Sequence, residues 1–345
     1  MDTMISTGLR TGDAGSPDPA NPVATGPRCD GMSPMVHVSV QCRFVDRTQW
    51  VQRAEAIDNS VFDALYVADH PGSTPSPFVL LAAAAAVTHR VRLGTCVLNA
   101  GRCDPMTLAS ELVTLDALSG GRAVFGIGAG HTPAEWEMVG LDFPPAVRRV
   151  EGLIELVDAV RRLLTGDPVT MAGPNFALRG ATLRRPGPVT DPIPLMVGGN
   201  GTRVLSFAAE HADIVGVTGL GRTRSDGHSH EADWSLPALD RSFDLVATTA
   251  ERAGRNPDIE ALLQYVEITD DPQQVADRLS ETIPGASGDD LLGAPFMWIG
   301  TPEQIAAHVR ESERRWGINR YVVRDGAAEA ARPVVELLRP PLRGA

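Results

Sequence analysis

Residues 91–131 constrain the fold of this chain more than any other stretch. A short apolar strand is predicted over 91–98, a helix over 105–118 and a second apolar strand over 122–130. Two short apolar strands joined through one helix form a βαβ unit, because parallel strands need a long crossover connection. The sequence therefore predicts a parallel sheet with helices between its strands.

The same alternation recurs along most of the chain. Eight apolar strands alternating with helices favour a closed (β/α)8 TIM barrel over an open sheet. Barrels of roughly 250 residues, with insertion loops, form one domain, so we predict a single TIM-barrel domain over 32–345. Residues 1–31 are rich in Pro, Gly, Ser and Thr without apolar periodicity, which predicts a disordered tail. The strands are expected at 36–42, 62–68, 91–98, 122–130, 194–197, 212–217, 262–269 and 319–323.

Composition excludes several classes of function. The formal net charge of −12 gives no basic footprint for nucleic acid or an anionic membrane. The longest apolar run, 78–87, is too short to cross a bilayer. The chain contains no lysine, so neither a Schiff-base lysine nor a phosphate-loop lysine is possible. Its four cysteines show no paired spacing, which predicts a reducing, cytoplasmic location.

Polar or glycine-rich residues follow one predicted strand after another, at the carboxyl ends where α/β proteins build their sites. Asp69 and His70 follow the second strand. A histidine there can act as a general acid or base over a ligand. The alternative is an ordinary loop histidine that hydrogen-bonds its own backbone.

Two glycine-rich segments have the same placement. Gly126-Ile-Gly128-Ala-Gly130 ends the fourth strand and lacks the third glycine of a dinucleotide fingerprint. Two interpretations remain: the glycines let a flat ring approach the backbone closely, or they form a plain tight turn. The segment from Gly198 to Arg203 lies between a strand and a helix. Its backbone N–H groups can hold a phosphate, or form an ordinary βα turn.

Some histidine and glutamate residues are spaced so that they could bind a metal ion. His131 and Glu135 are four residues apart, and His228, His230 and Glu231 cluster in a long polar loop. No His-x-His stands on the first strand, as metallohydrolase barrels require, so we expect no metal site. Arg122, at the opposite end of the fourth strand, is interpreted as a stability residue.

Taken together, the sequence resembles the superfamily of bacterial-luciferase-like flavin monooxygenases and coenzyme F420-dependent oxidoreductases, and within it the F420 branch. The similar pieces cover most of residues 35–325 in order. They are ALYVADH, VRLGTCVLNAGRCDP, ASELVTLDALSGGRAVFGIGAG, GLDFPPAVRRVEGLIELVDAVRRLLTG, PIPLMVGGNG with AAEHAD, and FMWIGTPEQIAAHV.

This resemblance implies a barrel with its cofactor at the carboxyl-terminal mouth. His70, beside Asp69, is then the residue that lies against the deazaflavin and takes part in catalysis. A bulge with a non-prolyl cis peptide supports the ring in these relatives and maps to Cys96-Val97. The glycines after the fifth strand, Gly198, Gly199 and Gly201 with Asn200, then contact ring and phosphate tail. Asp69, Gly128 and Gly130 complete the expected cofactor-binding set.

One position departs from the resemblance. Relatives that oxidise sugar phosphates carry a catalytic glutamate where this chain has His131, and their substrate lysines are absent here. His131 then serves as a second catalytic candidate or shapes the pocket.

The prediction is therefore F420-dependent hydride transfer with a small organic substrate, with reduction of C=C or C=N favoured over sugar-phosphate oxidation. The alternatives are an FMN-dependent two-component monooxygenase using O2 and a non-catalytic flavin-binding barrel. A homodimer is expected from the resemblance alone.

Overall fold

A computed structural model describes residues 35–183, 189–190, 192–223, 230–283 and 286–339. These residues fall within one compact unit, Met35–Ala345. The tail predicted over 1–31 and His228 lie outside the described residues. The boundary between tail and domain stays a prediction.

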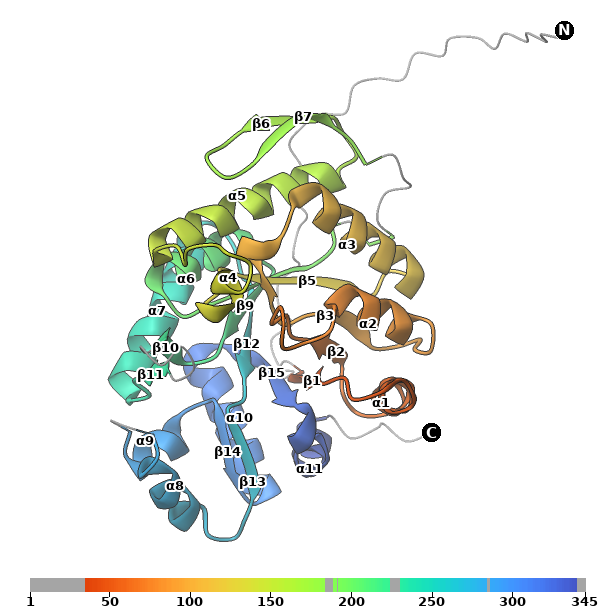
Figure 1. Ribbon diagram of the computed structural model, residues 1–345. Helices are drawn as coiled ribbons and strands as arrows, with labels where there is room; N and C mark the ends of the chain where they lie inside the picture. The colour runs from red at the N-terminus through yellow and green to blue at the C-terminus, as the bar shows by residue number, and fades with distance from the viewer. Residues whose placement is uncertain (1–34, 184–188, 191, 224–229, 284–285, 340–345) are drawn as a thin grey trace, which may run out of the picture. The chain divides into compact units, whose positions relative to one another are not determined.

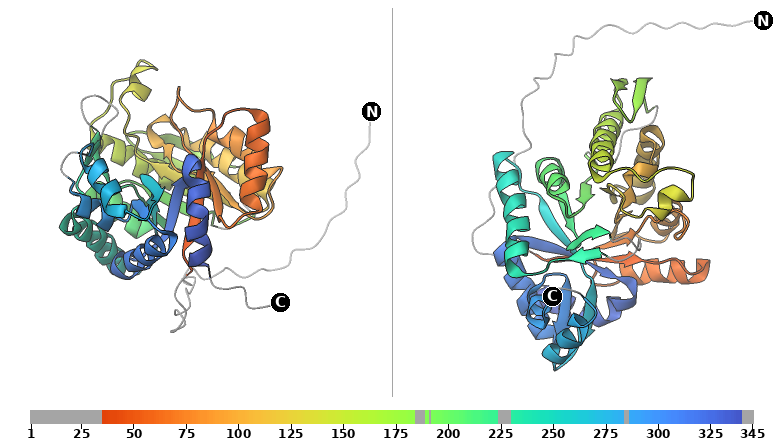
Figure 2. Two further views of the ribbon diagram at one scale, coloured as in Figure 1. Left: turned by 90° about the horizontal axis from the view of Figure 1, so that it is seen from below. Right: turned by 60° about the vertical axis from the view of Figure 1, so that its left-hand side comes forward.

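Eight parallel strands of this unit close into a barrel, so the predicted TIM barrel is confirmed. The strand order around it is β1-β2-β3-β5-β8-β9-β12-β15, and β15 pairs with β1 to complete the ring. A two-residue strand, β4, continues β3 along β5. Figures 1 and 2 show the helices arranged around the central strands. The closed barrel brings the carboxyl ends of all eight strands to one rim.

The barrel strands are β1 (His37–Cys42), β2 (Ala64–Val67), β3 (Arg92–Thr95), β4 (Leu98–Asn99), β5 (Ala123–Gly128), β8 (Leu195–Gly198), β9 (Ile214–Val217), β12 (Asp258–Leu262) and β15 (Ile318–Arg324). The helices are α1 (Arg47–Asp58), α2 (Pro77–Ala85), α3 (Pro105–Ser119), α4 (Ala134–Glu137), α5 (Ala146–Leu164), α6 (Thr202–His211), α7 (Leu236–Arg252), α8 (Pro272–Ser280), α9 (Gly288–Gly293), α10 (Pro302–Trp316) and α11 (Ala328–Leu338), with single turns η1 (Ala100–Arg102) and η2 (Asp325–Ala327). Outside the barrel lie β6 (Val169–Ala172), β7 (Ala177–Ala181), β10 (Leu220–Thr223), β11 (His230–Ala232), β13 (Tyr265–Ile268) and β14 (Met297–Gly300).

Local sequence signals explain where the helices begin and end. Helix α3 begins after Asp104, whose side chain accepts a hydrogen bond from the N–H of Thr107 at 2.8 Å, and it ends at Gly120 with φ 67°. Helix α10 begins with a reciprocal capping box between Thr301 and Gln304 and ends at Gly317, also left-handed. These caps set the lengths of helices α3 and α10, each of which connects two strands.

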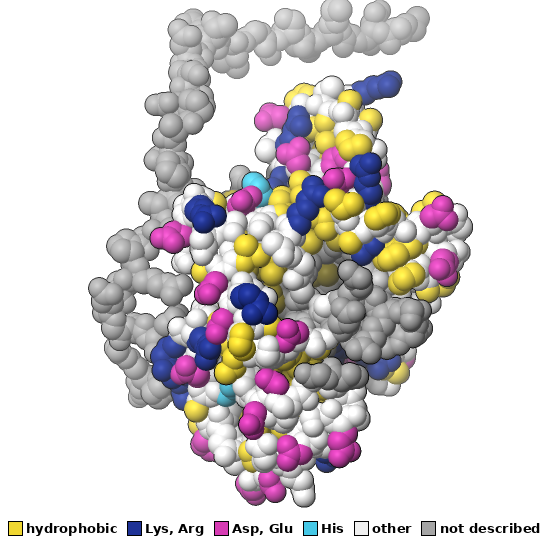
Figure 3. All heavy atoms as spheres, turned by 90° about the vertical axis from the view of Figure 1, so that its left-hand side faces the viewer, with side chains coloured by type: hydrophobic (Ala, Val, Ile, Leu, Met, Phe, Trp, Pro, Cys, Tyr) yellow, Lys and Arg dark blue, Asp and Glu magenta, His cyan; other side chains and the backbone are white. Residues whose placement is uncertain are grey.

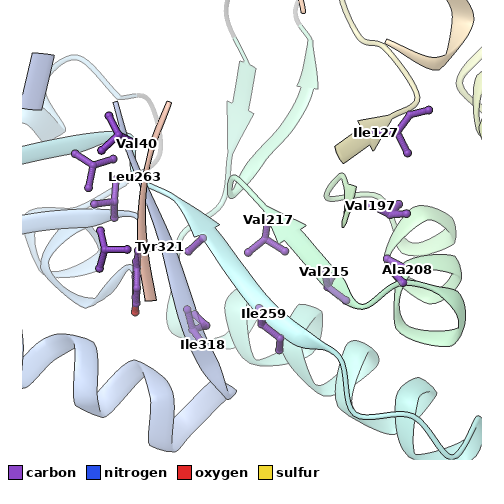
Figure 4. Close-up of a cluster of buried hydrophobic side chains, with 14 of the residues drawn as sticks. Val40, Ile127, Val197, Ala208, Val215, Val217, Ile259, Leu263, Ile318 and Tyr321 are labelled. Carbon is purple, nitrogen blue, oxygen red and sulfur yellow. The ribbon is translucent and has the colours of Figure 1, made fainter. Parts of the chain in front are cut away.

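Alternate residues of the strands form two apolar layers. Leu65 and Val67 of β2 point outward to the helices, whereas Ala64 and Tyr66 point into the barrel with Met196. Figure 4 shows part of the outer layer, where strand residues from several elements meet Ala208 of α6. Both faces of the strands are therefore apolar, as expected for a parallel sheet covered on each side.

The seventh strand lies elsewhere than predicted. The barrel uses β12, whereas β13, within the predicted range 262–269, pairs with β14 in a separate two-stranded sheet. Two of the five β12 residues are acidic, Asp258 and Glu260, so the more apolar stretch that follows has the stronger strand pattern. Figure 1 shows β13, β14, α8 and α9 together beside the barrel.

On the face in Figure 3, acidic and basic side chains are interspersed over the upper and middle part, whereas acidic side chains predominate toward the bottom. Within the described part of the chain, no helix combines the length and apolar character needed to cross a membrane. The three described cysteines are free thiols.

Candidate active site

His70 lies at the carboxyl end of β2, where the sequence placed it. A tight turn holds its backbone: its N–H donates to the hydroxyl of Thr74 at 2.8 Å, and its carbonyl accepts from Ser73 and Thr74. The side chain remains 41% exposed at the rim of the barrel. The backbone is therefore fixed while one side of the imidazole faces outward.

A buried glutamate holds the inner side of this imidazole. Nδ1 of His70 lies 2.8 Å from Oε1 of Glu135, whose side chain is only 5% exposed. The other oxygen of Glu135 accepts a hydrogen bond from Nδ2 of Asn99 at 2.7 Å. A carboxylate only accepts, so Nδ1 of His70 carries the shared proton and Nε2 is the atom left for chemistry.

Each partner shifts the pKa of the other. The hydrogen bond to Glu135 raises the pKa of His70 above its ordinary value, against the lowering effect of burial. Burial acts to raise the pKa of Glu135, but hydrogen bonds from His70 and Asn99 outweigh it and hold that pKa below the ordinary value. Each shift therefore favours the charged form of the group.

Asp69 and Gly130 complete the support of Asn99. The backbone N–H of Asn99 donates to Oδ2 of Asp69 at 3.0 Å, and burial raises the pKa of that carboxyl. Gly130 has φ 75°, and a Cβ there would lie 2.1 Å from Oδ1 of Asn99. Asp69 thus acts through the β4 backbone, and Gly130 makes room for the Asn99 amide.

The Cys96–Val97 peptide is cis, in agreement with the geometry that the resemblance implied. Nε2 of Gln41 on β1 donates to the carbonyl of Cys96 at 2.6 Å. The Val97 side chain fills the space above two glycines: a Cβ at Gly128 or Gly198 would approach it to 2.9 or 3.0 Å. Contact with Val97 therefore accounts for these two glycines, and their role toward a cofactor stays a prediction.

The segment after β8 leads into an uncapped helix. Gly201 precedes α6 without a side-chain cap, and a Cβ there would meet nothing within 4 Å. Asn200 accepts from the N–H groups of Thr218 and Gly219, each at 3.0 Å, and so ties this loop to the one after β9.

Other members of the segment are engaged within the protein. The N–H of Gly199 donates to the carbonyl of Gly216. Arg203 forms an ion pair with Glu151 at 3.3 Å. A pocket of about 400 Å³ opens beside the segment, lined by Asn200, Thr202 and Arg241 among others.

His131 reaches the same rim as His70. Their rings lie 5.9 Å apart, nearly perpendicular, and His131 is exposed. From the opposite side, Arg324 at the end of β15 donates to Oε1 of Gln264 at 3.1 Å. The charge of Arg324 is close enough to act against the pKa rise of His70.

Sequence reasoning missed Glu135 as the partner of His70, having considered it only beside His131 as a metal ligand. In the described part of the chain, no group of three or more His, Cys, Asp or Glu side chains is arranged so that it could hold a metal ion. Asn99 and Gln41 were also missed. Asn99 directly follows a predicted strand, as His70 does, so strand-end position was the signal that could have found it.

The sequence profile of the luciferase-like monooxygenase family matches residues 36–320. The chain therefore belongs to this family of TIM-barrel proteins.

Among particular relatives, limonene 1,2-monooxygenase of Rhodococcus erythropolis is 28% identical over 81% of this chain and 75% of its own length. The F420-dependent glucose-6-phosphate dehydrogenase of Intrasporangium calvum is 32% identical over 61% of this chain and 65% of its own length. Across the first three curated relatives, this chain spans between 37% and 75% of their lengths.

Among solved structures, the coenzyme F420-dependent tetrahydromethanopterin reductase of Methanopyrus kandleri superposes with a TM-score of 0.68. The alignment covers 88% of this chain and 98% of that one at 20% identity. At this identity the likeness concerns the barrel fold.

Proposed function

We propose that this protein is an F420-dependent oxidoreductase that transfers a hydride between the deazaflavin and a small organic substrate. The observation that carries the proposal is the ion pair of His70 and Glu135 at the carboxyl-terminal rim, next to the cis Cys96–Val97 peptide. The pair presents a proton-carrying imidazole where barrel enzymes place their chemistry.

The residues present fit such a cofactor. The uncapped start of α6 after Gly201 offers backbone N–H groups to a phosphate, and the neighbouring pocket of about 400 Å³ carries the guanidinium of Arg241. The bulge at Cys96–Val97, held by Gln41, would support the ring face. When bound, the deazaflavin supplies or accepts the hydride.

The protein then has three tasks. The rim must orient substrate and cofactor, exclude water and move one proton. Nε2 of His70 is the atom that we assign to the proton, because Nδ1 is engaged by Glu135. His131, with its ring 5.9 Å from that of His70, is the second candidate.

Reduction of a C=C or C=N bond is favoured over sugar-phosphate oxidation. The chain has no lysine for a substrate phosphate, and His131 replaces the glutamate expected of sugar-phosphate oxidisers. The raised pKa of His70 adds support, because reduction requires a proton donor near neutral pH.

The test is equilibrium binding of the purified apo-protein to F420 and to FMN, measured side by side by fluorescence quenching. Tight F420 binding with weak FMN binding is expected. Turnover of reduced F420 with enones and imines follows, comparing the wild type with His70→Ala. Unchanged rates in the variant would remove His70 from the mechanism.

An FMN-dependent monooxygenase using O2 is the second candidate, favoured by relatives such as the limonene monooxygenase. Selective FMN binding would support this monooxygenase function over the F420-dependent oxidoreductase. Binding of either cofactor without turnover by any reductant would point to a non-catalytic flavin-binding barrel.

We also propose that the protein acts as a cytoplasmic homodimer. Free cysteines are consistent with a reducing compartment. A groove of about 770 Å³ between α2 and α3, lined by Phe78, Met106 and Leu115, supports the dimer. Val79 and Leu118 beside it are 69% and 59% exposed, and apolar exposure of this kind marks interaction sites.

A further inference from the structure

Glu135 is the least exposed charged group at the rim, and its carboxylate has one hydrogen-bond donor for each oxygen. We propose that Glu135 is a positioning residue that orients His70 with Nδ1 inward and keeps the imidazole protonated, so that Nε2 is the proton donor to the substrate. This inference rests on the proposed function, which it deepens by naming the acid and the group that maintains it.

The hydrogen bonds around Asn99 permit one arrangement of its amide. Its Oδ1 accepts from the N–H of Gly101 at 3.1 Å, so its Nδ2 must face Glu135. Its own backbone N–H is held by Asp69. Asn99 therefore presents a fixed donor to Oε2 and leaves Oε1 for His70.

Burial of the carboxylate decides the charge of its partner. A buried carboxylate facing a neutral ring is poorly compensated, because an amide donor supplies only a partial charge. Protonation of His70 completes an ion pair and removes that cost. The exposed side of the ring keeps Nε2 in contact with the rim, where a substrate binds.

The other charged groups facing His70 come from three elements. Asp69 precedes it and favours the charged ring, whereas Arg324 of β15 disfavours it. His131, after β5, faces the ring edge-on and acts to lower the pKa of Glu135. The contact with Glu135 has the largest effect among them.

The proton and electron balance is then complete. A bound reduced deazaflavin would supply the hydride to one carbon of the substrate double bond, and Nε2 of His70 would give its proton to the electron pair released from that bond. Glu135 keeps its hydrogen bond to Nδ1–H throughout. The neutral imidazole regains a proton from solvent at Nε2.

The test uses the full-length apo-protein and needs no cofactor. Histidine ring NMR over a pH series is recorded for the wild type, Glu135→Gln and Glu137→Gln, with His70→Asn to assign the signal. Glu137 lies on the same helix but is exposed and has no contact with His70 among the described residues, so it is the matched control. The pKa of His70 is expected to fall in Glu135→Gln and to stay unchanged in Glu137→Gln.

An unchanged pKa in folded Glu135→Gln would overturn the proposal. Should that variant not fold, the wild type decides: at pH 6.5, the ordinary pKa of histidine, the ring nitrogen shifts must show a mostly cationic His70. A mostly neutral ring at that pH overturns the proposal equally.

Activity with reduced F420 supplies a separate readout. Because the protonated ring is the donor, the rate falls as pH rises through the pKa of His70, and this limb is expected at lower pH in Glu135→Gln. The rate near neutral pH should drop by roughly 100-fold. If the pKa of His70 falls in Glu135→Gln but the wild type does not bind F420, the proposed function is refuted. The role of Glu135 toward His70 is then still supported.

Discussion

At the scale of single residues, the rim depends on groups that touch one another before they touch any ligand. Val97 covers Gly128 and Gly198, and the Asn99 amide occupies the space beside Gly130. The expectation that these glycines admit a flat ring stays a prediction, and their immediate neighbours in the structure are protein side chains. Their small size therefore serves the packing of the residues that shape the site.

Gly130→Ala tests this packing, with Gly140→Ala as its control. Both glycines have nearly the same φ, 75° and 74°, but a Cβ at Gly140 meets nothing within 4 Å. Each variant should lose about 1–2 kcal/mol of unfolding free energy from the left-handed backbone. Gly130→Ala should lose more in urea unfolding, because its Cβ displaces Asn99, and it should also impair turnover. Equal losses and equal activities would contradict the account.

At the scale of elements, the strand–helix alternation could be predicted from the sequence because most barrel strands contain a short apolar stretch and are followed by polar or glycine-rich residues. Arg122 also behaves as predicted, donating to the backbone of Ser119, Val91 and Thr88 at the amino-terminal end of β5. The contact between Glu135 and His70 could not be predicted. The two residues are 65 positions apart in the chain, and they meet only because α4 places Glu135 beside His70. Spacing along a chain does not report such contacts.

Strands β12 and β15 also share a buried ion pair inside the barrel. Nε of Arg320 lies 3.1 Å from Oε2 of Glu260, whose exposed fraction is 1% and whose pKa is raised by burial. Tyr66 lies 3.5 Å from the same oxygen. Charges in this position link neighbouring strands below the site.

Glu260→Ala should lower the free energy of unfolding by about 3–5 kcal/mol, because it leaves Arg320 buried without its main partner. Glu260→Leu combined with Arg320→Met should recover most of that loss. As a surface control, Glu311→Ala removes the exposed ion pair with Arg314 and should cost at most about 1 kcal/mol. Urea unfolding measures all three, and a small loss in Glu260→Ala would refute the role of the pair.

At the scale of the whole molecule, closure of the barrel gathers the site from distant parts of the chain. Gln41 of β1, His70 after β2, Asn99 of β4 and Arg324 of β15 all reach one rim. The sequence indicated this rim through the strand ends, but not which strand was seventh. Two short stretches that begin seven residues apart, β12 with two acidic residues and the more apolar β13, compete for that place, and only the packing of the complete barrel selects β12.

The proposed homodimer is tested at the α2–α3 groove. Val79→Glu with Leu118→Glu should convert a dimer into a monomer in size-exclusion chromatography with light scattering, because charge replaces two exposed apolar side chains. Val45→Glu, at a position 63% exposed and outside the groove, should leave the dimer intact. A monomeric wild type, or a double variant that remains dimeric, would contradict the proposed interface.

Pairing of β1 with β15, from His37 beside Arg320 to Gln41 beside Arg324, also has a consequence for biosynthesis. The ribosome makes the second of these strands roughly 280 residues after the first, which takes about 15–60 s at typical rates of translation. During that time β1 has one edge without its partner, and the barrel cannot close. A nascent chain that stops before residue 318 therefore carries most of the rim residues but no completed site, so the site forms only after β15 has been made.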